Sequence, residues 1–164
     1  MPQSNLAVKP RLYLETTIPS YLVARRSRDL RLAADQETTQ EWWDTQRQKY
    51  ELFASQFVRA EAEHGDPKAA AERLALLEGI AILPELESAD QLAAEIIAAG
   101  LIPPHAAVDA SHIAIATAHG KDYLLTWNCR HIHNVTIIRQ IERLCGKLGY
   151  DCPIICTPDD LLEY

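Results

Sequence analysis

RLYLETTIPSYL (Arg11–Leu22) joins a short apolar run to a carboxylate and then to a helical pattern. The run RLYL, with its aromatic and branched members, predicts a buried strand that ends directly before Glu15. In open parallel sheets, ligands bind at the carboxyl ends of the strands. Glu15 therefore marks the edge of the sheet where a functional site is expected.

Three more apolar runs predict strands at 80–83, 123–126 and 153–157. Between the strands lie helical patterns, expected at 19–26, 33–52, 56–63, 67–78, 89–99, 104–119 and 135–148. This alternation predicts a three-layer α/β fold, with a mainly parallel central sheet of four to five strands and helices on both faces. The 164 residues, 48% of them apolar, fit a single domain spanning 1–164.

Composition also bears on location and partners. No apolar stretch is long enough to cross a bilayer, so we expect a cytoplasmic protein that does not enter the membrane. The four cysteines contain no CxxC pair, which favours reduced thiols. The net charge of −7 argues against nonspecific binding of nucleic acid. A local basic surface is nevertheless expected near the N-terminus around Arg25, Arg26 and Arg28, although a solvated helix face explains these arginines equally well.

Three carboxylates stand in otherwise apolar segments. They are Glu15, Glu61 in LFASQFVRAEAEHGD, and Asp109 in AAVDASHIAIATA. A charge at a core-like position needs a partner or a cation. Asn128 follows the strand pattern YLLT after one intervening residue, so it lies at the carboxyl end of a strand, as Glu15 does.

Helical spacing directs two of these acids inward. Glu61 follows Phe57 by four residues and so shares its stripe, while Asp109 lies four residues before Ile113 on an apolar face. These positions allow Glu15, Glu61, Asp109 and Asn128 to converge. Because Mg²⁺ and Mn²⁺ prefer oxygen ligands, the quartet predicts a site for one of these ions.

Simpler roles remain open for three of the four residues. Asn128 is also placed to cap a short helix in CRHIHN, and Glu15 to cap the helix that opens near Pro19. Glu61 has Arg59 and Arg73 as candidate ion-pair partners. Asp109 has no cation within a helical turn. Trp127 fits either a core position or a stacking platform for a base.

Other chemistries have weaker signals. The chain contains no GxGxxG motif, no Walker loop and no serine nucleophile elbow. The C-x-H-x-H run from Cys129 to His133 is a poor zinc motif, because it lacks a second ligand pair. A small-molecule phosphatase is disfavoured because no DxD pair follows the first strand.

Four short motifs occur in a fixed order along nearly the whole chain. They are YLETTIPSYL with Glu15, SQFVRAE with Ser55 and Glu61, DASHIAIATA with Asp109, and LLTWN with Thr126 and Asn128. In this order they resemble the PIN-domain nucleases, most closely the VapC-like toxins and related bacterial PIN proteins. The family usually carries Asp where this chain has Glu15, and many relatives carry Asp where it has Asn128.

The resemblance implies a PIN-like fold and metal-dependent endonuclease activity on single-stranded RNA, with Mg²⁺ or Mn²⁺ as cofactor. It implies that Glu15, Glu61, Asp109 and Asn128 form the catalytic metal site. Supporting polar side chains would be those of Thr16, Ser55 and Thr126. The arginines at positions 25, 26 and 28 would then contact RNA.

The resemblance also implies partners and an alternative function. The leading hypothesis is an endoribonuclease that serves as the toxin of a type II toxin-antitoxin pair, with an antitoxin protein as partner. A homodimer is expected through apolar and aromatic positions of the early helices. The alternative is a PIN-fold RNA-binding or regulatory module that is catalytically weak or inactive, motivated by Glu15 and Asn128.

Overall fold

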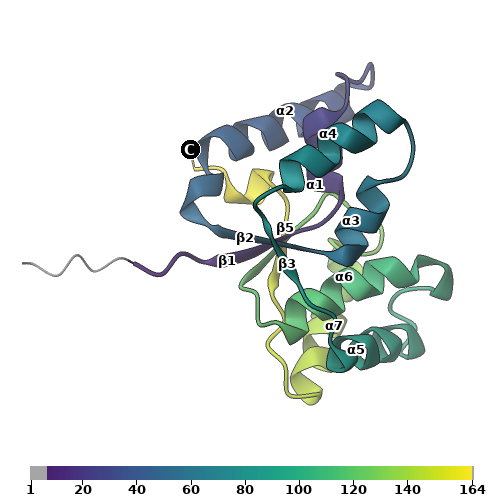
Figure 1. The fold of residues 1–164 in the computed structure, drawn as a ribbon. Coiled ribbons are helices and arrows are strands. Elements are labelled where there is room, and N and C mark those ends of the chain that lie inside the picture. The colour runs from purple at the N-terminus through teal and green to yellow at the C-terminus, as the bar shows by residue number, and fades with distance from the viewer. Residues whose placement is uncertain (1–6, 164) are drawn as a thin grey trace, which may run out of the picture.

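A five-stranded parallel sheet forms the centre of the computed structural model, which describes residues 7–163 (Figure 1). The strand order is β3-β2-β1-β4-β5, and each neighbouring pair is parallel. The strands are β1 (Arg11–Leu14), β2 (Glu51–Ser55), β3 (Ala81–Leu83), β4 (Tyr123–Leu125) and β5 (Ile154–Cys156). The expected α/β fold with a parallel sheet is confirmed. Residues 1–6 and 164 of the expected domain lie outside the described residues.

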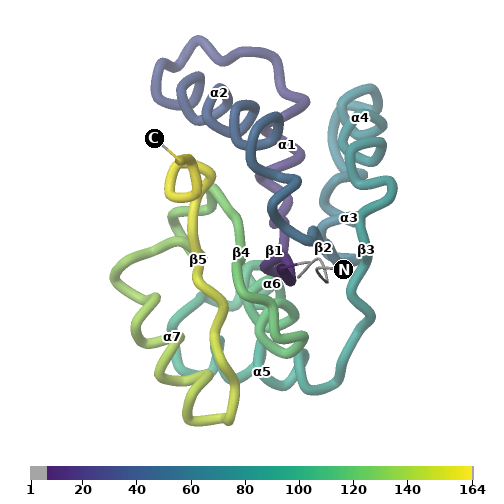
Figure 2. Tube along the Cα trace, turned by 90° about the vertical axis from the view of Figure 1, so that its left-hand side faces the viewer, coloured from purple at the N-terminus to yellow at the C-terminus, as the bar shows by residue number. Residues whose placement is uncertain are grey.

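Helices cover both faces of the sheet, as Figures 1 and 2 show from two directions. On one face lie α1 (Thr17–Val23), α2 (Leu30–Thr45) and α4 (Pro67–Leu77). On the other lie α5 (Glu87–Ala98), α6 (Ala107–Ala118) and α7 (Val135–Lys147). The short α3 (Gln56–Ala62) contacts both α4 and α6. Three 3₁₀ turns complete the described elements: Arg47–Lys49, Pro104–Ala106 and Asp159–Leu161.

Alternation along β1 divides the core into two clusters. Leu12 and Leu14 pack with Trp42 of α2, whereas Tyr13 belongs to the cluster on the opposite face, with Ile113 of α6. All five side chains are almost completely buried. The central strand is therefore covered on both faces, which is the usual condition of a parallel sheet.

The strand β2 was not predicted from the sequence. Residues 33–52 are expected to form one helix, but α2 ends at Thr45 and a 3₁₀ turn leads into the strand ELFAS. This segment pairs with β1 on one side and β3 on the other, so backbone hydrogen bonds on both edges stabilise it as a strand. Leu52, which the sequence places in the helix, and Phe53 therefore belong to the sheet.

Most helix boundaries follow local signals. Asp66 caps α4 by accepting a hydrogen bond from the backbone N–H of Ala69, and Pro67 occupies the first turn, as the sequence predicts. Gly120 adopts a positive φ of 64° between α6 and β4, a conformation that glycine tolerates best. The helix expected over 19–26 ends at Val23 instead, so Arg25 and Arg26 lie in the loop before α2.

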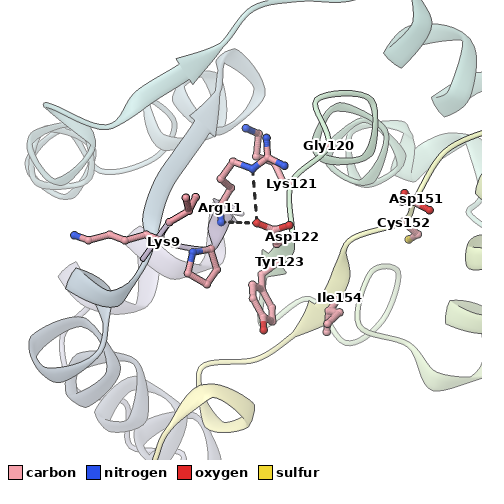
Figure 3. A pocket seen from close by; sticks show the side chains of 11 residues that line it. Lys9, Arg11, Gly120, Lys121, Asp122, Tyr123, Asp151, Cys152 and Ile154 are labelled. Carbon is pink, nitrogen blue, oxygen red and sulfur yellow. Dashed lines mark hydrogen bonds and ion pairs between the residues drawn. The ribbon is translucent and has the colours of Figure 1, made fainter. Parts of the chain in front are cut away.

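The two ends of the sheet differ in character. From β1 the chain proceeds to β2 and β3 on one side, and β4 and β5 occupy the other side, so β1 and β4 flank the topological switch point. Ligands of such sheets bind at the carboxyl ends of the strands. A cavity of about 880 Å³ lies at the other end, beside the amino ends of β1, β4 and β5, and is lined by Arg11, Lys121 and Asp122, among others (Figure 3). Within residues 7–163, no helix is long and apolar enough to cross a membrane.

Candidate metal centre

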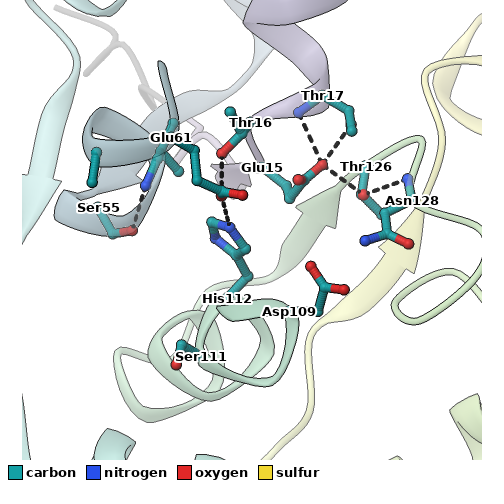
Figure 4. A network of polar contacts seen from close by, with 12 residues as sticks. Glu15, Thr16, Thr17, Ser55, Glu61, Asp109, Ser111, His112, Thr126 and Asn128 are labelled. Carbon is teal, nitrogen blue, oxygen red and sulfur yellow. Dashed lines mark hydrogen bonds and ion pairs between the residues drawn. The ribbon is translucent and has the colours of Figure 1, made fainter. Parts of the chain in front are cut away.

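The polar side chains singled out in the sequence gather at the carboxyl end of the sheet (Figure 4). Glu15 directly follows β1, and Asn128 lies three residues beyond the end of β4. Ser55 ends β2, Glu61 comes from α3 and Asp109 from the first turn of α6. The predicted quartet is thus delivered by four different parts of the chain to the switch point between β1 and β4.

The tightest group of metal-binding side chains differs from the predicted one. Among residues 7–163, Glu15, Glu61 and His112 each offer a ligand atom within 4.8 Å of the others. Asp109 is not part of that group, although Figure 4 shows its carboxylate facing Glu15 and Asn128. The structure therefore brings two of the predicted acids together with a histidine, and places Asp109 and Asn128 beside them.

The three carboxylates share one arrangement of hydrogen bonds. In Glu15 all three donors reach Oε2, in Glu61 both donors reach Oε1, and in Asp109 the single donor reaches Oδ2. The second oxygen of each carboxylate accepts no hydrogen bond from the described residues. Each acid is thus held in place through one oxygen, while the other is available to a ligand.

Glu15 is 3% exposed and has the most hydrogen bonds of the three. Its Oε2 accepts from the backbone N–H of Thr17 at 3.0 Å, from the Thr17 hydroxyl at 2.5 Å and from the Thr126 hydroxyl at 2.9 Å. Because Thr17 begins α1, Glu15 also satisfies one of the free N–H groups at that helix start. The capping role and the site role are therefore compatible.

Glu61 lies at the rim, with its side chain 40% exposed. Its Oε1 accepts hydrogen bonds from Thr16 Oγ1 at 2.7 Å and His112 Nε2 at 2.5 Å. Burial by itself raises the pKa of Glu61, but the hydrogen bonds from His112 and Thr16 lower the pKa on balance. Arg73 contacts the backbone carbonyls of Ala62 and His64 instead of this carboxylate.

Asp109 has a partner that its own helix does not supply. His131 Nδ1 lies 2.9 Å from Asp109 Oδ2, and both side chains are 18% exposed. This contact joins residues 22 positions apart, so a search for cations within one helical turn misses it. Within residues 7–163, no lysine or arginine forms an ion pair with Asp109, Glu15 or Glu61.

The short helix expected in CRHIHN is absent, and Asn128 instead stabilises the turn that residues 129–133 form. Its Oδ1 accepts a hydrogen bond from the backbone N–H of His131 at 3.0 Å, and its backbone carbonyl accepts from Ile132 and His133. Its own backbone N–H donates to Thr126 Oγ1 at 2.9 Å. Thr126 therefore joins Asn128 to Glu15 through its hydroxyl.

His112 is the residue that sequence reasoning missed. It is fully buried, its Nε2 contacts Glu61, and its Nδ1 lies 2.7 Å from the hydroxyl of Tyr13. That hydroxyl also lies 2.8 Å from Ser55 Oγ, and burial raises the pKa of Tyr13 far above its ordinary value. The available signal was a histidine three residues after Asp109 on an apolar helix.

The remaining candidates do not contact the three carboxylates, although the backbone N–H of Trp127 donates to Thr17 Oγ1 at 2.8 Å. Arg25, Arg26 and Arg28 are exposed in the loop between α1 and α2. Trp127 stacks on Tyr21 with an interplanar angle of 12°, and its Nε1 donates to Thr39 Oγ1, so it packs within the fold.

The C-x-H-x-H run does not converge on one point. Cys129 Sγ lies 3.9 Å from His133 Nδ1, and His133 Nε2 lies 3.6 Å from the Asp160 carboxylate. His131 faces Asp109 instead. All four cysteines of the chain are free, as expected.

No family model matches this chain, and no curated protein sequence matches it. Among solved structures, it is similar to a chain in the crystal structure of VapBC2 from Rickettsia felis bound to a DNA fragment from their promoter. The TM-score is 0.57 at 15% sequence identity, and the match covers 89% of this chain and 97% of that chain. At this identity the likeness concerns the fold: the chain has the PIN-like fold of VapC-like proteins, as its motifs predicted.

Proposed function

We propose that this chain is a divalent-metal-dependent endoribonuclease that hydrolyses phosphodiester bonds of single-stranded RNA. The observation that carries the proposal is the shared hydrogen-bond arrangement of Glu15, Glu61 and Asp109. Each carboxylate is fixed through one oxygen and leaves the other free of hydrogen bonds from the described residues. Three carboxylate oxygens without hydrogen bonds at one edge of the sheet are better explained by a bound cation than by a role in the fold alone.

The chemistry of the donors fits Mg²⁺ or Mn²⁺. These ions take oxygen ligands and are bound through a few carboxylates, water and substrate phosphate. The acids Glu15, Glu61 and Asp109 would hold the ion, and Asn128 would be the fourth member of the site. Since no lysine or arginine of residues 7–163 pairs with these acids, the cation also provides the missing countercharge.

The protein's own residues prepare the site. A bound divalent ion supplies Lewis-acid chemistry and lowers the pKa of a water ligand. Thr126 and Thr17 hold the carboxylate of Glu15, Thr16 holds that of Glu61, and Ser55 supports the site through Tyr13. These fixed side chains orient a phosphodiester without reorganising during the reaction, which is the basis of electrostatic preorganisation.

RNA would contact the exposed loop between α1 and α2. Arg25, Arg26 and Arg28 lie there, in a protein whose net charge is −7. A local basic patch positions phosphates without attracting nucleic acid to the whole surface. Neutralising these three arginines should weaken RNA binding and reduce its salt dependence.

We further propose that the enzyme is a cytoplasmic homodimer and the toxin of a type II toxin-antitoxin pair. The similar Rickettsia felis structure contains VapBC2, which supports an antitoxin protein as the partner of this chain. The four free cysteines fit a reducing compartment. Light scattering of the purified chain, alone and with its candidate antitoxin, tests both associations.

The central experiment is cleavage of a labelled single-stranded RNA with Mg²⁺ or Mn²⁺. We expect endonucleolytic products that disappear with a chelator and return when the metal is restored. Asp109→Asn should reduce the rate by at least about 10²-fold, because it replaces a charged ligand by an amide. The matched control is Asp151→Asn, an exposed acid near the opposite end of the sheet, which should leave the rate unchanged. Equal cleavage by both variants would overturn the proposal.

A second candidate function is RNA binding without catalysis. Two observations favour it: Glu15 stands where the resemblance implies Asp, and Asn128 already uses its Oδ1 to accept the His131 N–H. This function predicts that the chain retains single-stranded RNA while no metal-dependent product forms. The cleavage assay and a binding assay on the same RNA separate the two functions.

A further inference from the structure

We propose that His112 is a positioning residue that selects which oxygen of Glu61 faces the metal. The inference rests on the proposed function, since it assigns a role within the same metal site. His112 is completely buried on α6, whereas the Glu61 side chain is 40% exposed on the short helix α3. The buried imidazole of His112 is therefore held rigidly by its surroundings, whereas the exposed carboxylate of Glu61 depends on its hydrogen bonds for a fixed orientation.

The direction of the hydrogen bonds follows from donor and acceptor counting. An ionised Glu61 carboxylate only accepts, so the proton of His112 lies on Nε2, which is 2.5 Å from Glu61 Oε1. With His112 taken as the neutral imidazole, Nδ1 is the acceptor and the Tyr13 hydroxyl, 2.7 Å away, donates to it. The tautomer of His112 is thus set by its two partners.

The same counting extends one residue further. Because Tyr13 uses its only proton on His112, Ser55 must donate its hydroxyl proton to the Tyr13 oxygen, at 2.8 Å. Ser55 Oγ in turn accepts from the backbone N–H of Val58 at 3.4 Å. The result is a single directed series from the α3 backbone through Ser55, Tyr13 and His112 to Glu61, in which every proton is used once.

This series acts on one oxygen of Glu61 only. Thr16 donates to the same Oε1 at 2.7 Å, so Oε1 has two donors and Oε2 has none among the described residues. Rotation of the carboxylate would break both hydrogen bonds. His112 therefore presents Oε2 to the cation and, because its Nε2 carries a proton, it is not itself a ligand. Histidines and carboxylates that hold ligands in this way contribute about 10- to 100-fold to metal affinity or activity.

Two substitutions at position 112 separate positioning from folding. His112→Gln retains a donor near the place of Nε2 and loses the acceptor for Tyr13. His112→Asn retains an acceptor near the place of Nδ1 and is too short to reach Glu61. Each variant loses one of the two hydrogen bonds of His112. If His112 had a merely structural role, the two variants would lose Mn²⁺ affinity to a similar extent. We expect Mn²⁺ affinity within about threefold of wild type for His112→Gln, and a loss of about 10- to 100-fold for His112→Asn.

The measurements are Mn²⁺ titration by calorimetry and chemical unfolding of each variant, with His119→Gln at the end of the same helix as the matched control. Electron spin-echo spectroscopy of the Mn²⁺-loaded wild-type protein adds a test that needs no variant. We expect no coupling from a directly bound nitrogen. A direct nitrogen ligand, or equal affinity losses in the Gln and Asn variants, would overturn the role of His112. If the wild-type chain binds no Mn²⁺, the proposed function itself fails, which is a distinguishable result.

Discussion

The two ends of the parallel sheet differ in the partners of their charged side chains. At the amino end, Arg11 pairs with Asp122 through its backbone N–H and its guanidinium, and Lys121 Nζ lies 3.6 Å from the centre of the Phe53 ring. At the carboxyl end, Glu15, Glu61 and Asp109 gather without a lysine or arginine partner among residues 7–163. Arg11 and Asp122 form an ion pair at one end, whereas Glu61 and Asp109 at the other end contact histidines and Glu15 has hydroxyl and backbone N–H partners.

This difference indicates where a ligand is needed. The cavity of about 880 Å³ lies at the amino end, where Arg11 pairs with Asp122. The carboxyl end contains the unbalanced charge, on oxygens that are oriented but not hydrogen-bonded. An excess of fixed negative charge is costly to the fold unless a cation binds, so it is a better guide to the proposed metal site than the size of a cavity.

The largest expected effect comes from Glu15→Gln at the carboxyl end. The amide oxygen can replace Oε2 as acceptor for Thr17 and Thr126, while the amide N–H₂ takes the place of the oxygen offered to the cation. We expect cleavage to fall by at least about 10²-fold. At a Mn²⁺ concentration of 100 times the dissociation constant, the wild-type protein should gain about 2.7 kcal/mol, or about 5–10 °C in melting temperature, and the variant should not.

The stability of Glu15→Gln without metal independently tests whether the carboxyl end of the sheet carries excess negative charge. Removing one of three neighbouring negative charges relieves repulsion, so the variant without metal should be at least as stable as wild type. Thermal unfolding in chelator measures this. A marked loss of stability would mean that the charge of Glu15 is required by the fold, and the excess charge would then no longer identify a metal site.

An intermediate effect is expected from Thr126→Val. Thr126 is fully buried, donates to Glu15 and accepts from the backbone N–H of Asn128. Valine has the same shape but leaves that N–H without its acceptor, which should cost about 1–3 kcal/mol in the free energy of unfolding. We also expect Mn²⁺ affinity to fall by about tenfold, because Glu15 loses a restraint.

Thr117→Val is the matched control for this change. Thr117 is also buried, and its hydroxyl donates to the Ile113 carbonyl within α6, away from the carboxylates. Denaturant unfolding and Mn²⁺ titration should show a smaller loss of stability and unchanged affinity. Equal affinity losses in the two variants would indicate a general effect on the fold.

Local sequence signals predict the fold well where an element is specified by its own residues. The strand β1 is predicted with its bounds, and α4 follows from Asp66 and Pro67 at its start. The strand β2 was missed because five residues, ELFAS, follow a long polar helix and carry little periodicity of their own. Its conformation depends on hydrogen bonds to β1 and β3, and those partners are distant in the sequence.

The same distinction applies to the site. Glu15 and Asn128 are predicted to lie at strand ends because the carboxyl end of a strand can be located from its residues alone. His112 was missed because its contacts join it to Tyr13, 99 residues away, and to Glu61, 51 residues away. No local pattern encodes such contacts. Sequence reasoning therefore found the acids of the proposed metal site more readily than the residues that orient them.

At the amino end, Lys121→Met should leave cleavage unchanged but alter the response of stability to pH. Burial, followed by the charge of Arg11, lowers the pKa of Lys121 below its ordinary value of 10.5. The unfolded chain therefore binds this proton more tightly than the folded chain. The resulting penalty is complete below the folded pKa and is relieved as pH rises through that pKa towards 10.5.

Chemical unfolding of wild type and Lys121→Met between pH 7 and 10.5 measures this linkage. The free energy of unfolding of wild type minus that of the variant should increase over the alkaline part of the range. Titration of the tyrosines cancels in this difference. A difference that stays constant with pH would mean that Lys121 is as well solvated in the fold as in the unfolded chain, and that the amino end carries no strain from its charges.

The smallest effect is expected from Asp122→Asn, which has the same chemistry as Asp109→Asn but lies at the opposite end of the sheet. Asparagine retains an acceptor for the Arg11 backbone N–H, which lies 2.7 Å from Asp122 Oδ2. The ion pair that it removes is about half exposed and therefore contributes within about 1 kcal/mol. Mn²⁺ affinity and cleavage should not change. If this variant lost cleavage to the extent expected of Asp109→Asn, the negative charge at the carboxyl end would be acting only as part of the overall charge of the protein, and local excess could no longer explain the site.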